Sequence, residues 1–323
     1  MNRRSTLLAL GAAIVAPSLT LAQSRRGVHR IGFVIPPREE GARSFVMAFR
    51  EGLHGLGYVE GKNVVIDFRF ADDDLTRLPA LAEEVVRRNP DVIVTASPPG
   101  VRAVRKAAGT IPIVMAAVYD PVGQGFVASL GRPGGNITGV SVQYEDAVPK
   151  ILELLRRVVP GITKIWVLRT VDPSHRSILA RIAALAPSTQ VVAIEVNAPR
   201  EIDGALSGIG KSRDEVLVVL PHPLFNTRPE VVTRLAAERR VPGLYPYGSY
   251  ADAGGLMSFG IELSEAFRRA ARYVAQILAG AKPADLPVEQ PTKITLTVNL
   301  KVASLLGITV PQDILLRADR LIE

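Results

Sequence analysis

The chain has 323 residues, of which 47% are hydrophobic and 22% are charged, and its formal net charge is +8. This length favours two domains over a single core, and the hydrophobic fraction argues against a disordered chain. The sequence contains no cysteine, which excludes disulfide bonds, thiolate nucleophiles and zinc–thiolate sites.

The basic residues do not form a cluster in the sequence. Lysine and arginine are interspersed with aspartate and glutamate, and only 5% of the residues are aromatic. Nucleic-acid binding requires a concentrated basic footprint, so we expect no nucleic-acid partner. The four histidines, His29, His54, His175 and His222, lack the spacing of a metal motif. We expect no histidine-built metal site and no cofactor, although a carboxylate metal site stays open.

The N-terminal segment has the layout of a secretory signal peptide. Arg3 and Arg4 precede the apolar run 7–15 (LLALGAAIV), and Ala22 provides a small residue before a cleavage point at Gln23. The apolar run is too short to span a membrane. We therefore expect residues 1–22 to be a signal peptide and the mature protein to be periplasmic. The arginine pair leaves both general secretion and twin-arginine export open.

The first half of the chain alternates apolar strands with amphipathic helices, as parallel βαβ units do. In the first predicted helix, Phe45, Phe49 and Leu53 form one buried stripe, and Gly57 ends the helix. The pattern predicts strands at 29–35, 63–70, 91–96, 111–118 and 136–140, and helices at 42–56, 75–88, 101–108 and 121–130.

The second half repeats this organisation. Residues 215–245 contain a strand, a proline-rich turn, a helix and a second strand, as residues 91–121 do. Prolines between 283 and 291 stiffen a linker near the end of the chain. The remaining pattern predicts strands at 163–169, 190–196 and 293–299, and helices at 148–159, 177–185, 200–209, 262–279 and 300–306.

The repeat predicts an α/β fold with two Rossmann-like, doubly wound lobes joined by a multi-strand hinge. We assign residues 29–143 and 262–288 to lobe 1, and residues 144–261 and 289–323 to lobe 2. Small ligands usually bind in a cleft between such lobes, beyond the carboxyl ends of the parallel strands.

Six segments spread along the chain together resemble a known family. They lie at 51–64, 77–82, 111–123, 132–139 (RPGGNITG), 254–258 (GGLMS) and 281–293 (AKPADLPVEQPTK). The chain is similar to the ABC-transporter substrate-binding proteins that include tryptophan-binding members, over about residues 30–323.

This resemblance implies a type I periplasmic binding protein fold with three crossovers between the lobes. It also implies a small-molecule solute as ligand, delivery to an ABC permease in the inner membrane, and a monomer. Residues 169–173 (RTVDP) depart from the Asn-Pro-like stretch of tryptophan-binding members, which puts tryptophan itself in question.

The turns after the parallel strands supply the candidate ligand-binding residues, because those turns should face the cleft. Ser44 is added from the first predicted helix. The candidates are Pro37, Arg38, Ser44, Ser97, Pro98, Tyr119, Asp120, Arg169, Ser174, Pro221, His222, Tyr247 and Tyr250.

Each candidate also has a structural interpretation. Ser97 could grip a carboxylate at a helix N-terminus or act only as an N-cap. Asp120 could take an ammonium group or cap the helix predicted at 121–130. Tyr247 and Tyr250 could stack on a flat ligand or pack on the lobe.

The remaining polar candidates have similar alternatives. His222 could donate to the ligand or be a surface turn residue. Arg38 and Arg169 could pair with an anion or simply be solvated.

We predict from this sequence a periplasmic solute-binding component of an ABC transporter, which captures an amino acid or other small organic molecule by hinge closure and is not an enzyme. A ligand-sensing module for a membrane signalling partner is the alternative. A hydrolase would need His175 or His222 beside Ser97 and a carboxylate, and the sequence has no GxSxG elbow.

Overall fold

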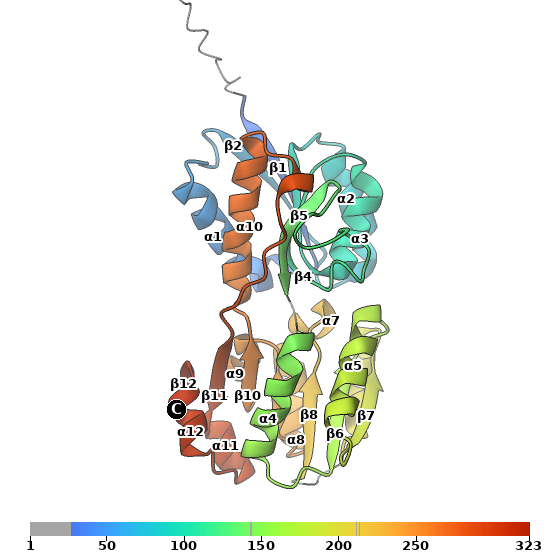
Figure 1. Ribbon diagram of the computed structural model, residues 1–323, viewed down its shortest axis with the longest axis vertical. Coiled ribbons are helices and arrows are strands. Elements are labelled where there is room, and N and C mark those ends of the chain that lie inside the picture. The colour runs from blue at the N-terminus through green and yellow to red at the C-terminus, as the bar shows by residue number, and fades with distance from the viewer. Residues whose placement is uncertain (1–26, 143, 211, 213) are drawn as a thin grey trace, which may run out of the picture.

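The computed structural model describes residues 27–142, 144–210, 212 and 214–323, so the predicted signal peptide lies outside the described residues. Figure 1 shows two α/β lobes, one above the other. Within the described part of the chain, every helix is too short or too polar to cross a membrane.

Lobe 1 is built on a five-stranded parallel sheet in the order β2-β1-β3-β4-β5. Its strands are β1 (His29–Ile35), β2 (Val64–Phe70), β3 (Val92–Thr95), β4 (Ile113–Tyr119) and β5 (Ile137–Val142). Its helices are α1 (Glu39–Gly55), α2 (Leu78–Val86), α3 (Ser97–Ala108) and α10 (Leu263–Leu278).

The two faces of this sheet are covered by different helix pairs. Ile31, Phe33 and Ile35 of β1 share one core with α1 and α10, whereas Val34 belongs to the core under α2 and α3. This is the alternation that a strand buried on both faces requires. Gly52 allows α1 to approach α10 closely, because a Cβ there would lie 2.8 Å from the Cβ of Ala271.

Lobe 2 is built on a seven-stranded sheet in the order β12-β11-β10-β9-β8-β6-β7, in which only the β10–β11 pair of the described strands is antiparallel. Its strands are β6 (Lys164–Arg169), β7 (Gln190–Glu195), β8 (Glu215–Val219), β9 (Gly243–Tyr245), β10 (Met257–Gly260), β11 (Thr295–Asn299) and β12 (Arg320–Ile322). Its helices are α4 (Val148–Val158), α5 (Pro173–Leu185), α6 (Ile202–Ser207), α7 (Pro223–Asn226), α8 (Pro229–Glu238), α9 (Gly248–Asp252), α11 (Leu300–Leu306) and α12 (Gln312–Arg317).

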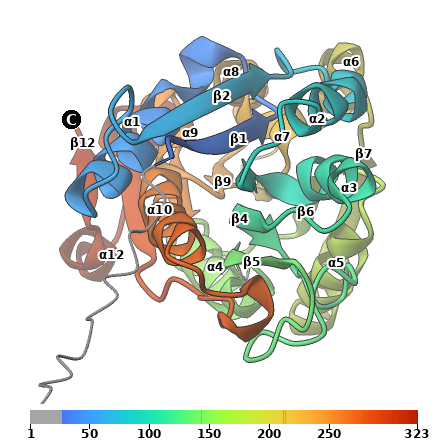
Figure 2. The same ribbon diagram turned by 90° about the horizontal axis from the view of Figure 1, so that it is seen from above.

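The chain passes between the lobes after β5, after β10 and before β11 (Figures 1 and 2). Before the last passage, the chain runs beside β5, where Ser141 N donates to Glu289 O and Glu289 N donates to Gly139 O. The predicted α/β fold with two Rossmann-like lobes is confirmed.

The helix predicted at 121–130 is wrong, because this segment forms successive turns. Asp120 Oδ1 accepts a hydrogen bond from Gly123 N, and Gly125 adopts a φ of 66°, in the left-handed region. A side chain that binds a nearby backbone N–H competes with helix formation, and two glycines add to its cost.

Candidate ligand-binding site

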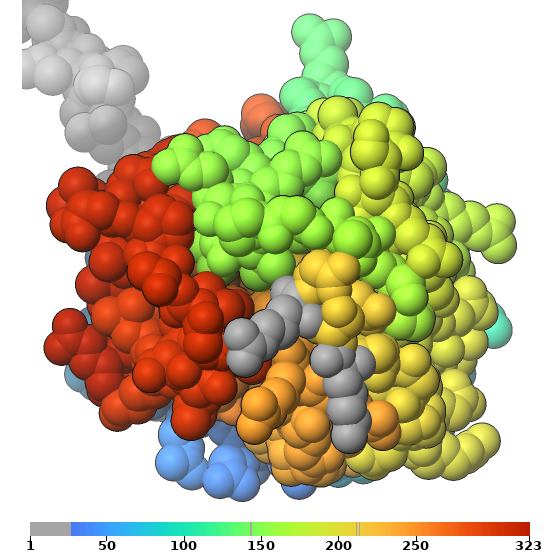
Figure 3. All heavy atoms as spheres, turned by 90° about the horizontal axis from the view of Figure 1, so that it is seen from below, coloured from blue at the N-terminus to red at the C-terminus, as the bar shows by residue number. Residues whose placement is uncertain are grey.

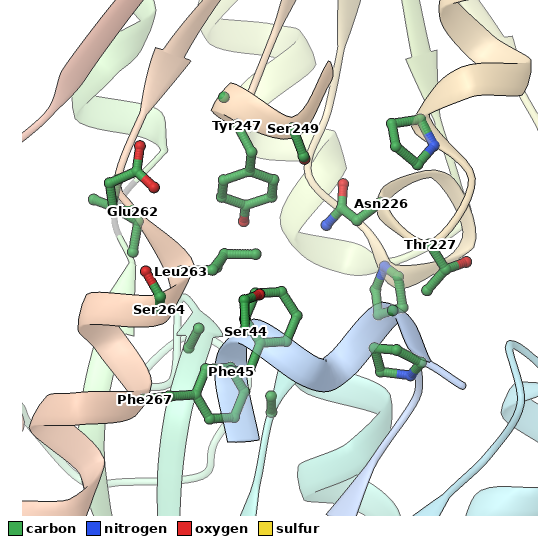
Figure 4. A pocket seen from close by; sticks show the side chains of 18 of the residues that line it. Ser44, Phe45, Asn226, Thr227, Tyr247, Ser249, Glu262, Leu263, Ser264 and Phe267 are labelled. Atoms are coloured by element: carbon green, nitrogen blue, oxygen red, sulfur yellow. The ribbon is translucent and has the colours of Figure 1, made fainter. Parts of the chain in front are cut away.

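A cavity of about 490 Å³ lies between the lobes, and both lobes supply its walls (Figure 4). It opens at the carboxyl ends of β1, β3, β4, β9 and β10, where an open α/β sheet usually binds its ligand. The lining includes Ser44, Phe45, Ser97 and Tyr119 from lobe 1, Asn226, Glu230, Tyr247, Asp252 and Arg320 from lobe 2, and Glu262 and Phe267 from the β10–α10 passage and α10.

Aromatic rings form one wall of the cavity. The rings of Phe45 and Phe267 stack with their centroids 5.0 Å apart and an interplanar angle of 7°. Phe45 comes from α1 and Phe267 from α10, the helix pair packed through Gly52. Tyr119, at the end of β4, adds a third ring. A wall of this kind can accept the flat face of an aromatic ligand.

Two buried hydroxyl groups in the cavity wall have no hydrogen-bond partner among the described residues. They belong to Ser97 of lobe 1, which is 5% exposed, and Tyr247 of lobe 2, which is 4% exposed. Burial raises the pKa of the Tyr247 phenol, so it stays protonated and able to donate. Leaving a buried hydroxyl unpaired costs about 1–3 kcal/mol, so both positions favour a bound ligand group.

Ser97 is also strained. It is the first residue of α3 and has a φ of 64°, in the region that only glycine adopts freely. The N-cap is Ala96, and the Ser97 hydroxyl makes no capping bond. Pro98 and Pro99 lack an N–H, and Gly100 donates to the N-cap carbonyl within the helix, so the first turn of α3 leaves the N–H of Ser97 for an anion.

The rim of the cavity carries more negative than positive charge. Glu230, Asp252 and Glu262 line it, together with Arg320. The Arg320 guanidinium donates to Asp252 Oδ1 over 2.5 Å, which neutralises that carboxylate. The remaining acidic rim suits an ammonium group, although the chain as a whole is basic.

Behind the lobe 2 wall, Tyr250 is fully buried and stacks on Tyr245 at a centroid distance of 5.0 Å. Its hydroxyl donates to Asn226 Oδ1 over 3.0 Å. Asn226 ends α7, is partly exposed and lines the cavity. Figure 4 shows the Asn226 amide nitrogen directed toward the cavity.

A second contact between the lobes lies between α3 and α5, and we call Arg102, Gln124 and Asp172 the interlobe clasp. Arg102 Nη2 donates to Asp172 Oδ2 over 3.1 Å, and Gln124 Nε2 donates to Asp172 Oδ1 over 2.9 Å. Arg102 also donates to Gln124 Oε1. The Asp172 side chain is only 3% exposed. Burial alone would raise the pKa of Asp172, but hydrogen bonds from Ser174 and Arg102 hold it below its ordinary value.

Residues 31–322 match the family model of the ABC transporter substrate binding proteins. The chain belongs to this family. The resemblance inferred from the sequence motifs is therefore confirmed, and a family of ligand-binding proteins accounts for a cavity between two lobes.

Three relatives of this substrate-binding protein are informative. A tyrosine-binding protein of Clostridioides difficile is 27% identical over 267 residues, which cover 82% of this chain and 75% of the relative. The structure of an ABC domain from Streptococcus pneumonia in complex with L-Trp is 25% identical, with a TM-score of 0.82. A ligand-free, open substrate binding protein with adhesive properties from Clostridium difficile is also 25% identical, with a TM-score of 0.67. Each structural comparison covers 91% of this chain and 99% of the other.

The sequence candidates for ligand binding in this substrate-binding protein divide into two groups. Five of them line the cavity, namely Pro37, Ser44, Ser97, Tyr119 and Tyr247. The other eight lie outside the cavity lining, namely Arg38, Pro98, Asp120, Arg169, Ser174, Pro221, His222 and Tyr250.

Several of the outer candidates have protein partners. Arg38 Nε donates to Asp73 Oδ2 over 2.7 Å, and Asp120 accepts from Gly123 N. Buried Arg169 donates to Thr170 O, and its guanidinium lies 3.4 Å from a Glu195 carboxylate oxygen. Ser174 Oγ donates to Asp172 in the clasp. These groups are occupied within their own lobes.

Two of the four histidines, His175 and His222, lie near the clasp. The rings of His175 and His222 are 5.8 Å apart, His175 Nδ1 accepts from Thr170 N, and His222 Nδ1 accepts from Leu224 N. Burial lowers the pKa of both, that of His222 to about 3. Because the Ser97 hydroxyl has no partner in the described structure, neither histidine activates it.

The sequence candidates did not include several aromatic and polar lining residues, among them Phe45, Asn226, Glu230, Asp252, Glu262, Phe267 and Arg320. Phe45 was assigned to the buried stripe of its helix, and Phe267 lies within the helix predicted at 262–279. Asn226 lies four residues after His222, the last candidate of the proline-rich turn. Arg320 reaches the cavity through β12, whose pairing with β11 had no recognisable signal in the sequence.

Proposed function

We propose that this protein captures an aromatic amino acid between its lobes in the periplasm and delivers it to an ABC permease. The observation that carries the proposal is the pair of buried, unpartnered hydroxyls of Ser97 and Tyr247, one on each lobe, in a cavity with a stacked aromatic wall. A ligand that joins the lobes would satisfy both hydroxyls at once.

The cavity has a size and chemistry that fit such a ligand. Its volume of about 490 Å³ falls in the usual range for small-molecule sites, about 300–1,000 Å³. The ring would pack on Phe45 and Phe267, the ammonium group would lie at the acidic rim, and the carboxylate would accept hydrogen bonds from the wall. One relative is named a tyrosine-binding protein, and another was solved in complex with L-Trp. Both support the same class of ligand.

Hinge closure is the proposed mechanism of capture. At equal identity and coverage, the structure superposes better on the L-Trp complex than on the open, ligand-free relative. The interlobe clasp supports the same view, since its three side chains meet only when the lobes are close. A ligand that contacts both lobes would then shift the population toward the closed form.

Ligand binding can be tested on the chain that starts at Gln23. We expect thermal unfolding with L-tryptophan, L-tyrosine or L-phenylalanine to occur at higher temperature, because a ligand at a hundred times its Kd adds about 2.7 kcal/mol of stability. Ser97→Ala should weaken binding about tenfold, whereas Ser304→Ala, on the exposed side of α11, should not. Calorimetry with no aromatic amino acid binding would contradict the proposal.

The compartment can be tested separately. Residues 1–26, fused to a reporter that is active only outside the cytoplasm, should give activity that is lost when Arg3 and Arg4 are replaced by glutamate. An inactive fusion with the native segment would contradict the periplasmic location without affecting the ligand assignment.

A further inference from the structure

We infer that Tyr250 is a positioning residue that orients the Asn226 amide, so that the cavity selects ligands with a hydrogen-bond acceptor, such as a carboxylate, at that point. The inference rests on the proposed function, because it concerns the same cavity. It assigns recognition of the ligand's acceptor group to a side chain of lobe 2, held by a residue that does not touch the ligand.

Tyr250 cannot act on the ligand directly. It is completely buried, its ring lies against Tyr245, and it is not part of the cavity lining. Tyr247, three residues earlier at the start of α9, does reach the cavity. The two tyrosines therefore have separate tasks, one in the wall and one behind it.

The hydrogen bond between Tyr250 and Asn226 fixes which end of the amide faces the ligand. Burial raises the pKa of the Tyr250 phenol well above its ordinary value, so it always carries its proton. Among the described residues, Asn226 Oδ1 is the acceptor for that proton. A flipped amide would leave the buried O–H without an acceptor, which is costly, so Oδ1 faces Tyr250 and Nδ2 faces away.

The orientation has a chemical consequence. An amide nitrogen offers two N–H donors and no acceptor, so this point of the cavity attracts a carboxylate or carbonyl oxygen and disfavours an ammonium group. Glu262 lies on the other side of Tyr247 from Asn226 in Figure 4. Asn226 therefore supplies a donor on one side of Tyr247 and Glu262 a carboxylate on the other, while Glu230 lies near Tyr250 on the Asn226 side. An amino acid that pairs its carboxylate with Asn226 and its ammonium group with Glu262 satisfies both.

The test compares ligands with and without the carboxylate. L-tryptophan and tryptamine, and L-tyrosine and tyramine, are titrated calorimetrically against wild type, Tyr250→Phe and Asn226→Asp. Tyr250→Phe keeps the ring and removes the proton, so we expect affinity for the amino acids to fall about tenfold and affinity for the amines to change less than twofold. Asn226→Asp still accepts from Tyr250 but presents an oxygen to the cavity, so the ratio of amino-acid to amine affinity should fall about a hundredfold.

Two controls separate positioning from general damage. Tyr245→Phe alters the neighbouring buried ring, which makes no bond to Asn226, and should leave the ratio unchanged. Tyr250→Phe in an Asn226→Ala background should have no further effect on the ratio. Equal weakening of amino acids and amines in Tyr250→Phe and Asn226→Asp would overturn the inference alone. Wild-type protein that binds none of the four probes would overturn the proposed function and this inference with it.

Discussion

The gap between the lobes has two parts that differ in how their polar groups are satisfied. In the interlobe clasp, the Asp172 carboxylate accepts hydrogen bonds from Arg102, Gln124 and Ser174. In the cavity, Ser97 and Tyr247 have buried hydroxyls without partners, and Ser97 is strained as well. The protein thus completes its own contacts at one part and leaves them incomplete at the other. Changes in the two parts should therefore have opposite effects on the unliganded protein.

Removing the central carboxylate of the clasp should have the largest effect. Asp172→Ala removes the N-cap of α5 and the partner of Arg102 and Gln124, so we expect the free energy of unfolding to fall by about 3 kcal/mol. Urea denaturation measures this change, and small-angle scattering should show a larger radius of gyration. Asp172→Asn is the matched control, because it keeps the cap without the charge. A loss of less than about 1 kcal/mol for Asp172→Ala would mean that the clasp contributes little.

Acid should lower the free energy of unfolding through His222, which lies near the clasp. A histidine in the unfolded chain titrates near 6.5, whereas burial lowers the pKa of His222 to about 3. Below pH 6.5 the unfolded chain binds a proton that the folded chain does not, so stability is constant above this pH and falls below it. Between pH 6.5 and 5 we expect a loss of roughly 2 kcal/mol, at about 1.4 kcal/mol per pKa unit.

The contribution of His222 can be isolated by substitution. His222→Asn retains an oxygen that can cap Leu224 N but does not titrate. Urea denaturation between pH 5 and 7 should therefore give a shallower pH dependence for the variant, with His175 accounting for the remaining slope. Parallel curves for wild type and His222→Asn would show that His222 does not contribute.

The smallest of the expected effects concerns the cavity, and it is a gain in stability where the others are losses. Ser97→Gly removes an unpaired buried hydroxyl and the strain of a φ of 64°, so we expect the unliganded protein to gain about 1 kcal/mol of stability. Ser304→Gly in α11 should instead lose up to about 1 kcal/mol, because glycine disfavours a helix. Chemical denaturation without ligand measures both variants. A destabilised Ser97→Gly would show that the strain is not stored there.

The two lobes could be predicted from the sequence because the central strands, such as β3, β4 and β8, are fully buried and several helices have clear apolar stripes. The segment 121–130 misled the prediction, since its apolar residues suit a helix while Asp120 and two glycines favour turns. Local competition of this kind depends on backbone hydrogen bonds that periodicity does not reveal.

The site was predictable only where it follows the topology. Ser97 and Tyr247 lie in the turns that follow the parallel strands β3 and β9, so the positions of the strands along the chain indicated them. Phe45 and Phe267 extend the core stripes of two helices into the cavity, and the sequence does not mark where core ends and cavity begins. Tyr250 was expected at the ligand for the same reason as Tyr247, but the turn of α9 directs it into the lobe.

The three passages between the lobes also bear on kinetics. They tie the lobes together through the segments near α10 and β11, while the clasp joins α3 to α5 on the far side (Figure 1). Figure 3, a view of the molecule from below, shows the red C-terminal segments of lobe 2 on one flank and the yellow-green segments around α5 on the opposite flank. In the proposed hinge motion, lobes connected by chain passages on one side separate first on the other, so release of a ligand would begin with rupture of the Asp172 bonds. The lifetime of the proposed complex would then depend on side chains that lie outside the cavity lining.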